Sequence, residues 1–182
     1  MLGLAVQPPS RARPGAPLYP PIAARLSSET SVFEELSQKW AVATLVRSSG
    51  EVLHDKLSGK VADSAHPLPE SGANSGPVQW FDRAYFYFPD LKIDEPGRYK
   101  IRISLMQMDY SGVSSPHGEA VVCEEVDSRS IVIDDRAPSP TIPRGYSQSC
   151  WRPNLTCIDG QERAFLRVLK ADGQQIPSPH TG

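Results

Sequence analysis

The sequence predicts an all-β sandwich that ends in a short helix. Short apolar runs recur along most of the chain, one of them with strict alternation of apolar and polar residues, and turn-forming residues separate them. Proline (18 residues) and glycine (13 residues) are abundant among the 182 residues, which favours turns over long helices. Short strands joined by turns are typical of two packed antiparallel sheets.

The N-terminal 21 residues are predicted to form an opening strand and an arm. Residues 8–21 read PPSRARPGAPLYPP. Because proline fixes its backbone and lacks an amide hydrogen, this stretch is expected to be an extended arm rather than a regular element. The main domain then covers residues 22–177, and residues 178–182 are a tail.

Three strands and a loop are predicted in the first half of this domain. The apolar run IAARLSS begins at Ile22, and two further runs at residues 40–46 and 52–61 are split by the turn signal Ser48-Ser49-Gly50. Residues 62–78 read ADSAHPLPESGANSGPV, which predicts a long loop and the most mobile part of the domain.

The run YFYFPDL, residues 85–91, raises the choice between a ligand platform and a core strand. In a strand, Tyr85 and Tyr87 share one face while Phe86 and Phe88 share the other, and Pro89 ends the pairing. We favour the core strand, with both faces covered by the other sheet, the C-terminal helix or a dimer partner. The phenylalanines are expected between the sheets and the tyrosines on the more accessible face, hydroxyls outward.

The segment after this run has the clearest alternation in the chain. Its apolar and polar positions predict a half-buried antiparallel strand with a basic outer face. The apolar positions are Tyr99, Ile101, Ile103 and Leu105, and the polar ones are Arg98, Lys100, Arg102 and Ser104. The runs EAVVCEEV (119–126) and RSIVIDD (129–135) add two more strands.

The C-terminal part is predicted to be a linker followed by a helix. Residues 136–153 are rich in Pro, Ser and Arg and indicate a linker. Over residues 161–172 the period changes to that of a helix, which is expected to dock on the sandwich and to end at Asp172-Gly173. Its apolar stripe consists of Phe165, Leu166, Val168 and Leu169.

The sequence carries no enzyme motif, so we expect a non-enzymatic protein without a cofactor. The three cysteines, Cys123, Cys150 and Cys157, lack the spacing of a metal site and are too few for a disulfide framework. No signal peptide or membrane span is recognisable, which predicts an intracellular, reducing compartment. The net charge of −2 excludes a globally basic nucleic-acid binder but leaves room for a local basic patch.

The arginines of the arm are the first candidate binding residues. The guanidinium groups of Arg11 and Arg13 suit phosphate oxygens, and an extended arm can follow a groove. The alternative is a solvated arm with no ligand. For Arg98, Lys100 and Arg102 the corresponding alternatives are an ordinary polar sheet face and a face that a partner covers.

Several segments resemble the velvet-domain family of fungal regulators. LAVQPPSRAR (4–13) resembles the opening strand of the family, LYPPIAARL (18–26) its proline-led second strand, and YFYFPDLKIDEPGRYKIRISL (85–105) its most recognisable segment. The residues that carry the central likeness are Phe86, Phe88, Pro89, Leu91, Tyr99, Ile101 and Ile103. The closing Arg-x-Leu…Gly-x-x-Ile pattern is similar to Arg167, Leu169, Gly173 and Ile176, so the likeness spans residues 4–177.

The resemblance implies an immunoglobulin-like β-sandwich similar to the Rel-homology DNA-binding domain. It implies a regulator of fungal development, sporulation and secondary metabolism in the nucleus and cytoplasm. Its partners would be double-stranded DNA, other velvet proteins as homo- or heterodimers, and a methyltransferase-like regulator. The matching DNA-contact positions are Arg11, Arg13 and Arg25. The alternative is a dimerisation module that tunes other velvet proteins with little DNA contact of its own.

Overall fold

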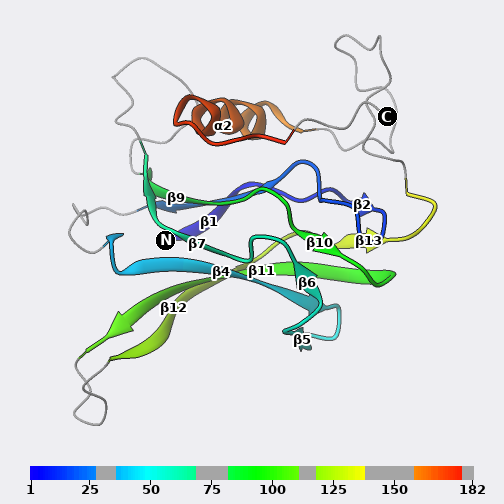
Figure 1. Cartoon of the computed structure of the whole chain (residues 1–182), viewed down its shortest axis with the longest axis horizontal. Coiled ribbons are helices and arrows are strands. Elements are labelled where there is room, and N and C mark those ends of the chain that lie inside the picture. The colour runs from blue at the N-terminus through cyan, green and yellow to red at the C-terminus, as the bar shows by residue number, and fades with distance from the viewer. Residues whose placement is uncertain (28–35, 69–81, 111–117, 138–157, 178–182) are drawn as a thin grey trace.

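The chain forms an all-β sandwich with a short C-terminal helix, which confirms the predicted fold class (Figure 1). The computed structural model describes residues 1–27, 36–68, 82–110, 118–137 and 158–177. The predicted linker 136–153 lies outside these residues from position 138 onward, as do the tail 178–182 and the part of the predicted loop 62–78 that begins at position 69.

One sheet of the sandwich has four strands in the order β1-β3-β9-β8, all antiparallel. They are β1 (Leu2–Val6), β3 (Ile22–Ser27), β9 (Asp82–Phe88) and β8 (His66–Pro67). The run IAARLSS thus forms a central strand, and its alternate residues Ile22 and Ala24 are fully buried between the sheets.

The other sheet has seven strands, with the path β2-β13-β11-β4-β5, β12 on β11 and β7 on β4. These strands are β2 (Arg11–Ala12), β4 (Lys39–Arg47), β5 (Val52–Leu53), β7 (Ala62–Ser64), β11 (Gly97–Asp109), β12 (Glu119–Asp127) and β13 (Ile131–Ile133). A two-stranded pair, β6 (Leu57–Ser58) with β10 (Lys92–Ile93), completes the described strands.

Strand β11 follows the predicted alternation. Tyr99, Ile101 and Ile103 are at most 4% exposed and face the other sheet, where they meet Phe86 and Phe88 in one core cluster. Leu91 belongs to the same cluster, and Pro89 ends strand β9 as predicted. The opposite face of β11, which we call the outer face of the seven-stranded sheet, carries the basic side chains.

Helix α2 (Gly160–Ala171) lies on the four-stranded sheet, on the side away from β4 and β11, so the molecule has three layers (Figure 1). Asp159 caps its first turn, because its carboxylate accepts from the amide of Glu162 and Glu162 reaches back to the amide of Asp159. Phe165, Leu166 and Leu169 are the apolar stripe that packs on the sheet. The predicted docking of this helix on the sandwich is therefore confirmed.

The expectation that Tyr85 and Tyr87 point outward is wrong. Both side chains are at most 1% exposed, because the face of β9 that they share is the one that α2 covers. The Tyr85 hydroxyl donates to the carboxylate of Asp172, and the Tyr87 hydroxyl donates to the Gln175 carbonyl at 3.0 Å. The helix end thus supplies the hydrogen-bond acceptors that solvent was expected to provide.

Residues 52–68 also differ from the prediction. The expected strand over residues 52–61 is broken into the short strands β5 and β6, and part of the expected loop forms β7 and β8. Asp63 of β7 explains how this segment is held between the sheets. One of its carboxylate oxygens accepts from the Tyr87 amide at 2.6 Å, and the other contacts Lys60 Nζ at 2.6 Å and His66 Nε2 at 3.1 Å.

Candidate nucleic-acid interface

The predicted Pro-rich arm forms a strand only at Arg11–Ala12, which is strand β2 of the seven-stranded sheet, and there the expectation of no regular element is wrong. Strand β2 runs parallel to β13, and hydrogen bonds join the Val132 amide to the Ser10 carbonyl (2.9 Å) and the Asp134 amide to the Ala12 carbonyl (3.1 Å). Leu18 is 2% exposed, and its amide donates to Leu91 at 2.8 Å. Buried side chains and paired amides therefore fix the segment in place.

The side chains of Arg11 and Arg13, at alternate positions of this segment, are both exposed to solvent. The guanidinium group of Arg11 forms an ion pair with Asp134 at 2.6 Å, and this hydrogen bond lowers the pKa of the Asp134 carboxyl. Arg13 donates from Nε to the Ala137 carbonyl at 2.8 Å. The charge of Arg11 is therefore balanced by a carboxylate, whereas the hydrogen-bond partner of Arg13 is a neutral carbonyl group.

Strand pairing brings these arginines next to Arg98. Arg98 lies opposite Val132, and Val132 lies opposite Arg11, so all three side chains share one face. Arg11 and Arg98 are two strand spacings apart, roughly 10 Å. Lys100 stands two positions further along β11 on the same face. We call Arg11, Arg13, Arg98 and Lys100 the basic cluster.

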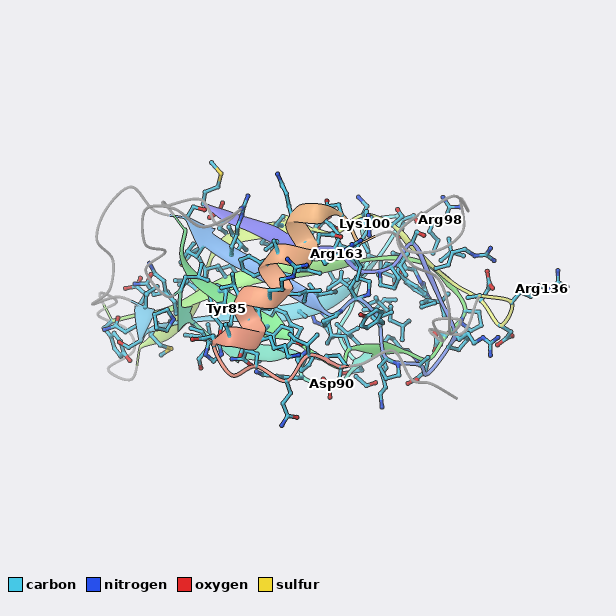
Figure 2. The ribbon with its side chains drawn as sticks, turned by 90° about the horizontal axis from the view of Figure 1, so that it is seen from above. Tyr85, Asp90, Arg98, Lys100, Arg136 and Arg163 are labelled. Carbon is cyan, nitrogen blue, oxygen red and sulfur yellow. The ribbon has the colours of Figure 1, made fainter. Side chains whose placement is uncertain are left out.

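The carboxylates around the basic cluster leave most of its charge unpaired. Further along the outer face, Arg102 is neutralised by Asp127 (2.7 Å) and Glu125 (3.4 Å). Within the described ranges, no carboxylate forms an ion pair with Arg13, Arg98 or Lys100. Figure 2 places Arg98 and Arg136 toward the same end of the molecule, which in Figure 1 is the end of β2 and β13.

An open hollow of about 390 Å³ adjoins the basic cluster at Arg98. Its lining includes a second guanidinium group, Arg47, and the hydroxyl groups of Ser48 and Ser49. Arg47 is paired with Glu51 at 2.8 Å, and the lining residue Glu95 is paired with Lys56 at 2.6 Å. This side of the cluster therefore offers hydrogen-bond donors to an anion without adding a large net charge.

Arg25, the third predicted contact residue, is not part of this surface. It lies in β3 of the four-stranded sheet, opposite Gly3 on one side and Tyr85 on the other. Its side chain is half-buried on the face that α2 covers, and a Cβ atom on Gly3 would lie 3.9 Å from its Nε. The structure therefore brings Arg11 and Arg13 together and separates Arg25 from them.

Sequence reasoning identified the basic face of residues 98–102 but did not join it to the arm. The signal that joins them is the strand over residues 131–133, which pairs with β2 on one side and β11 on the other. No pattern in a single sequence specifies such pairing between distant segments. Arg136, which is exposed just after β13, was assigned to the linker.

Other kinds of site find no support in the described part of the chain. No group of three or more His, Cys, Asp or Glu side chains there could hold a metal ion. Among the same residues, no helix is long and apolar enough to cross a membrane.

Comparison with known proteins adds no assignment. No family model matches the chain, and no curated protein matches it either.

Proposed function

We propose that this protein is a DNA-binding transcriptional regulator of the velvet type. The observation that carries the proposal is the basic cluster, in which Arg11 and Arg13 stand beside Arg98 and Lys100 on one rigid sheet face. Guanidinium groups fixed by sheet structure suit the phosphate backbone, and they position a protein on DNA without reading its sequence.

The cellular role rests on the velvet likeness of residues 4–177. On that basis we propose control of fungal development, sporulation and secondary metabolism, from the nucleus and cytoplasm. The Rel-homology-like character of the sandwich belongs to the same proposal.

The test is DNA binding by a double variant that lacks two charges of the basic cluster. Arg13→Ala/Arg98→Ala is preferable to removal of Arg11, because Arg11→Ala would leave the Asp134 carboxylate unpaired and add a repulsive charge. At about 50 mM salt we expect the variant to bind a duplex at least tenfold more weakly than the wild type. Its salt slope should fall by about two, one for each lost phosphate contact.

Arg163→Ala/Arg167→Ala is the matched control. Both residues are exposed on α2, on the other side of the molecule, so the same charge is removed from a different surface. We expect it to retain wild-type affinity within a factor of about two. Absence of wild-type binding at low salt, or an equal loss in both double variants, would disprove the DNA proposal.

A second candidate function is an interaction module, and one observation favours it. Val122 and Tyr110 are 54% and 63% exposed, and they lie near the C-terminal end of β11 and the N-terminal end of β12. Exposed apolar side chains that gather on one face are typical of protein–protein contacts. A protein that pulls down no partner and remains monomeric would not be such a module.

A further inference from the structure

The turn between β4 and β5 presents two serine hydroxyl groups to solvent. The Gly50 amide donates to the Arg47 carbonyl at 2.9 Å, and the Arg47 amide donates to the Glu51 carbonyl at 2.9 Å. Gly50 has a φ of 90°, the left-handed conformation that closes a short hairpin loop of this kind. Ser48 and Ser49 occupy the central positions, and every residue of the turn is exposed. An enzyme that modifies hydroxyl groups can therefore reach both.

The same turn lies next to the basic cluster. Arg47, the last residue of β4, pairs with Tyr99 of β11, so the next position of this antiparallel register places Ser48 beside Arg98. Both residues line the open hollow of about 390 Å³, which leaves room for a phosphoryl group. A group attached to Ser48 Oγ would thus stand between the turn and the basic cluster.

The charges around the hollow favour an anion at this position. In the part of the chain that the structure describes, no carboxylate forms an ion pair with Arg98. The lining carboxylate Glu95 is already paired with Lys56 at 2.6 Å, and Arg47 of the lining is paired with Glu51. The planar fork of a guanidinium group suits the oxygens of a phosphate, so Arg98 is available as its partner.

An open hollow of this kind suits a tethered anion better than a free one. A free phosphate ion would exchange with water from an unenclosed surface. A phosphoryl group on Ser48 is held beside Arg98 by the chain itself, which gives it a high effective concentration there. The geometry therefore favours a covalent modification of Ser48 over a binding site for a small anion.

The β4–β5 hairpin is also held by few contacts. Strand β5 has two residues, Val52 and Leu53, which pair with Val46 and Leu45. Both residues of β5 are only half-buried. A short strand with few buried contacts opens at a low free-energy cost, so the turn can enter the cleft of a modifying enzyme while the sandwich stays folded.

We propose that Ser48 is a phosphorylation site and that its phosphorylation weakens DNA binding by the basic cluster. A protein kinase transfers the γ-phosphoryl group of a nucleoside triphosphate to Ser48 Oγ. The new P–O bond replaces the bond to the β-phosphate, the hydroxyl proton passes to solvent, and the nucleoside diphosphate leaves. Glu51 stands three positions after Ser48, so the expected enzyme is a kinase that selects an acidic residue at that distance.

Phosphorylation would act through local charge. A phosphoserine carries about 1.5 to 2 negative charges at neutral pH. Arg13, Arg98 and Lys100 are the cations of the basic cluster without a carboxylate partner in the described residues, so one phosphoryl group offsets much of their charge. By engaging Arg98, it also removes a guanidinium group from DNA. This inference deepens the proposed DNA-binding function and rests on it.

Ser64 provides the matched control. It is exposed on β7 and pairs with Trp40, seven positions along β4 from Arg47. Seven residues of strand span about 23 Å. This exceeds two Debye lengths at 0.1 M salt, each about 10 Å. Phosphoserine at position 64 therefore adds the same charge to the molecule without reaching the basic cluster.

The contact with Arg98 is tested first, in the absence of DNA. Phosphoserine is incorporated during translation at position 48 or 64, and its second ionisation is followed by phosphorus NMR. Because a nearby guanidinium group favours the doubly charged form, the pKa of the phosphate at position 48 should rise by about half a unit or more when Arg98→Ala is added. At position 64 the pKa should not change. Equal behaviour at the two positions would overturn the contact.

Duplex binding of the same phosphorylated proteins tests the consequence. At about 50 mM salt the protein phosphorylated at Ser48 is expected to bind at least tenfold more weakly than the unmodified wild type, with a salt slope lower by about one to two. The protein phosphorylated at Ser64 should stay within about twofold. Failure of the DNA proposal appears as no binding by the unmodified wild type, whereas failure of this inference appears as binding that phosphorylation of Ser48 leaves unchanged.

The kinase reaction itself is the last test. A purified kinase that selects acidic residues is incubated with ATP and the unmodified protein, and the phosphorylated position is read by mass spectrometry. We expect phosphate on Ser48 in the wild type and a loss of this product in Glu51→Gln. Circular dichroism of Glu51→Gln checks that the sandwich is still folded. A wild type that carries no phosphate on Ser48 would overturn the modification site.

Discussion

Tyr85 and Tyr87 show how burial changes the chemistry of single residues in this protein. Both phenol rings lie between the four-stranded sheet and α2, and burial is the main cause that raises the pKa of each hydroxyl. For Tyr85 the hydrogen bond to Asp172 raises the pKa further. In both cases the folded protein favours the neutral form of the side chain.

These raised pKa values predict a loss of stability at alkaline pH. An unfolded tyrosine ionises near pH 10.0, while the folded one holds its proton to higher pH. The stabilising contribution is therefore fully present below pH 10.0 and decreases as the pH rises above it. We expect the wild type to lose up to about 1.4 kcal/mol per pH unit and per tyrosine.

Urea unfolding between about pH 8 and pH 11 measures this effect. In Tyr85→Phe/Tyr87→Phe the free energy of unfolding should depend less on pH in the alkaline range than in the wild type. Tyr110→Phe removes an exposed hydroxyl and serves as the control, with the wild-type dependence. The same alkaline slope in all three proteins would contradict the assignment.

At the scale of elements, strand β7 links the two sheets through one carboxylate. Asp63 belongs to the seven-stranded sheet by its pairing with β4, yet its side chain accepts from the Tyr87 amide of the other sheet. Its side chain is 5% exposed, whereas the side chains of Lys60 and His66, which also contact it, are 40% and 33% exposed. The short strands β7 and β8 therefore depend on a polar contact as well as on apolar packing.

Asp63→Ala is expected to lower the free energy of unfolding by about 1–3 kcal/mol, because the Tyr87 amide would lose its acceptor. Asp135→Ala, which removes an exposed carboxylate, should change it by less than about 0.5 kcal/mol. Urea denaturation at neutral pH measures both variants. Similar midpoints for the two would show that Asp63 does not hold the sheets together.

The docking of α2 is the second feature at this scale with a measurable consequence. Leu169 is fully buried against the sheet, so Leu169→Ala should cost about 2–5 kcal/mol. Arg167→Ala on the exposed side of the same helix should cost less than about 0.5 kcal/mol. If the two substitutions had equal effects on the urea midpoint, the helix would not be part of the folded core.

The elements that were predictable from sequence are those whose periodicity is local. The alternation from Tyr99 to Leu105 and the Phe86/Phe88 pair each specify which side chains enter the core. The burial of Tyr85 and Tyr87 was not predictable, because the same alternation fits a face that is open to solvent and a face that a helix covers. The four outward positions Arg102, Ser104, Met106 and Met108 change from polar to apolar, which shows in the sequence that the outer face of this strand is not polar along its whole length.

The candidate site was only partly predictable for the same reason. Arg11 and Arg13 stand out by composition, but their neighbours Arg98 and Lys100 come from a strand more than eighty positions away. The ion pair between Arg11 and Asp134 also joins distant segments. Such contacts depend on the order of strands in the sheet, which a single sequence does not specify.

At the scale of the whole molecule, one sheet face carries three successive surfaces. The basic cluster lies at one end, the ion pairs of Arg102 lie in the middle, and the side chains of Met106 and Met108 lie at the other end. The opposite side of the molecule is closed by α2. Under the proposed function, recognition takes place on the outer face of the seven-stranded sheet, and the layers beneath it supply stability.

The whole molecule has a net charge of −2, whereas the local charge that DNA would meet at the basic cluster is positive. The two charges can be tested separately. Asp134→Asn and Asp135→Asn raise the net charge by the same amount, and only Asp134 binds Arg11. If local charge governs binding, Asp134→Asn frees the Arg11 guanidinium and should strengthen duplex binding several-fold, with a salt slope steeper by about one. Asp135→Asn should change the affinity by less than about twofold.

Fluorescence anisotropy of a labelled duplex over a series of salt concentrations measures both affinity and slope. Equal gains from the two asparagine variants would mean that the net charge of the molecule governs binding and that the basic cluster has no special role. A gain confined to Asp134→Asn would instead place Arg11 at the phosphate backbone, in competition with its own carboxylate partner. DNA affinity would then be limited in the wild type by the same ion pair that fixes the side chain of Arg11 on the sheet.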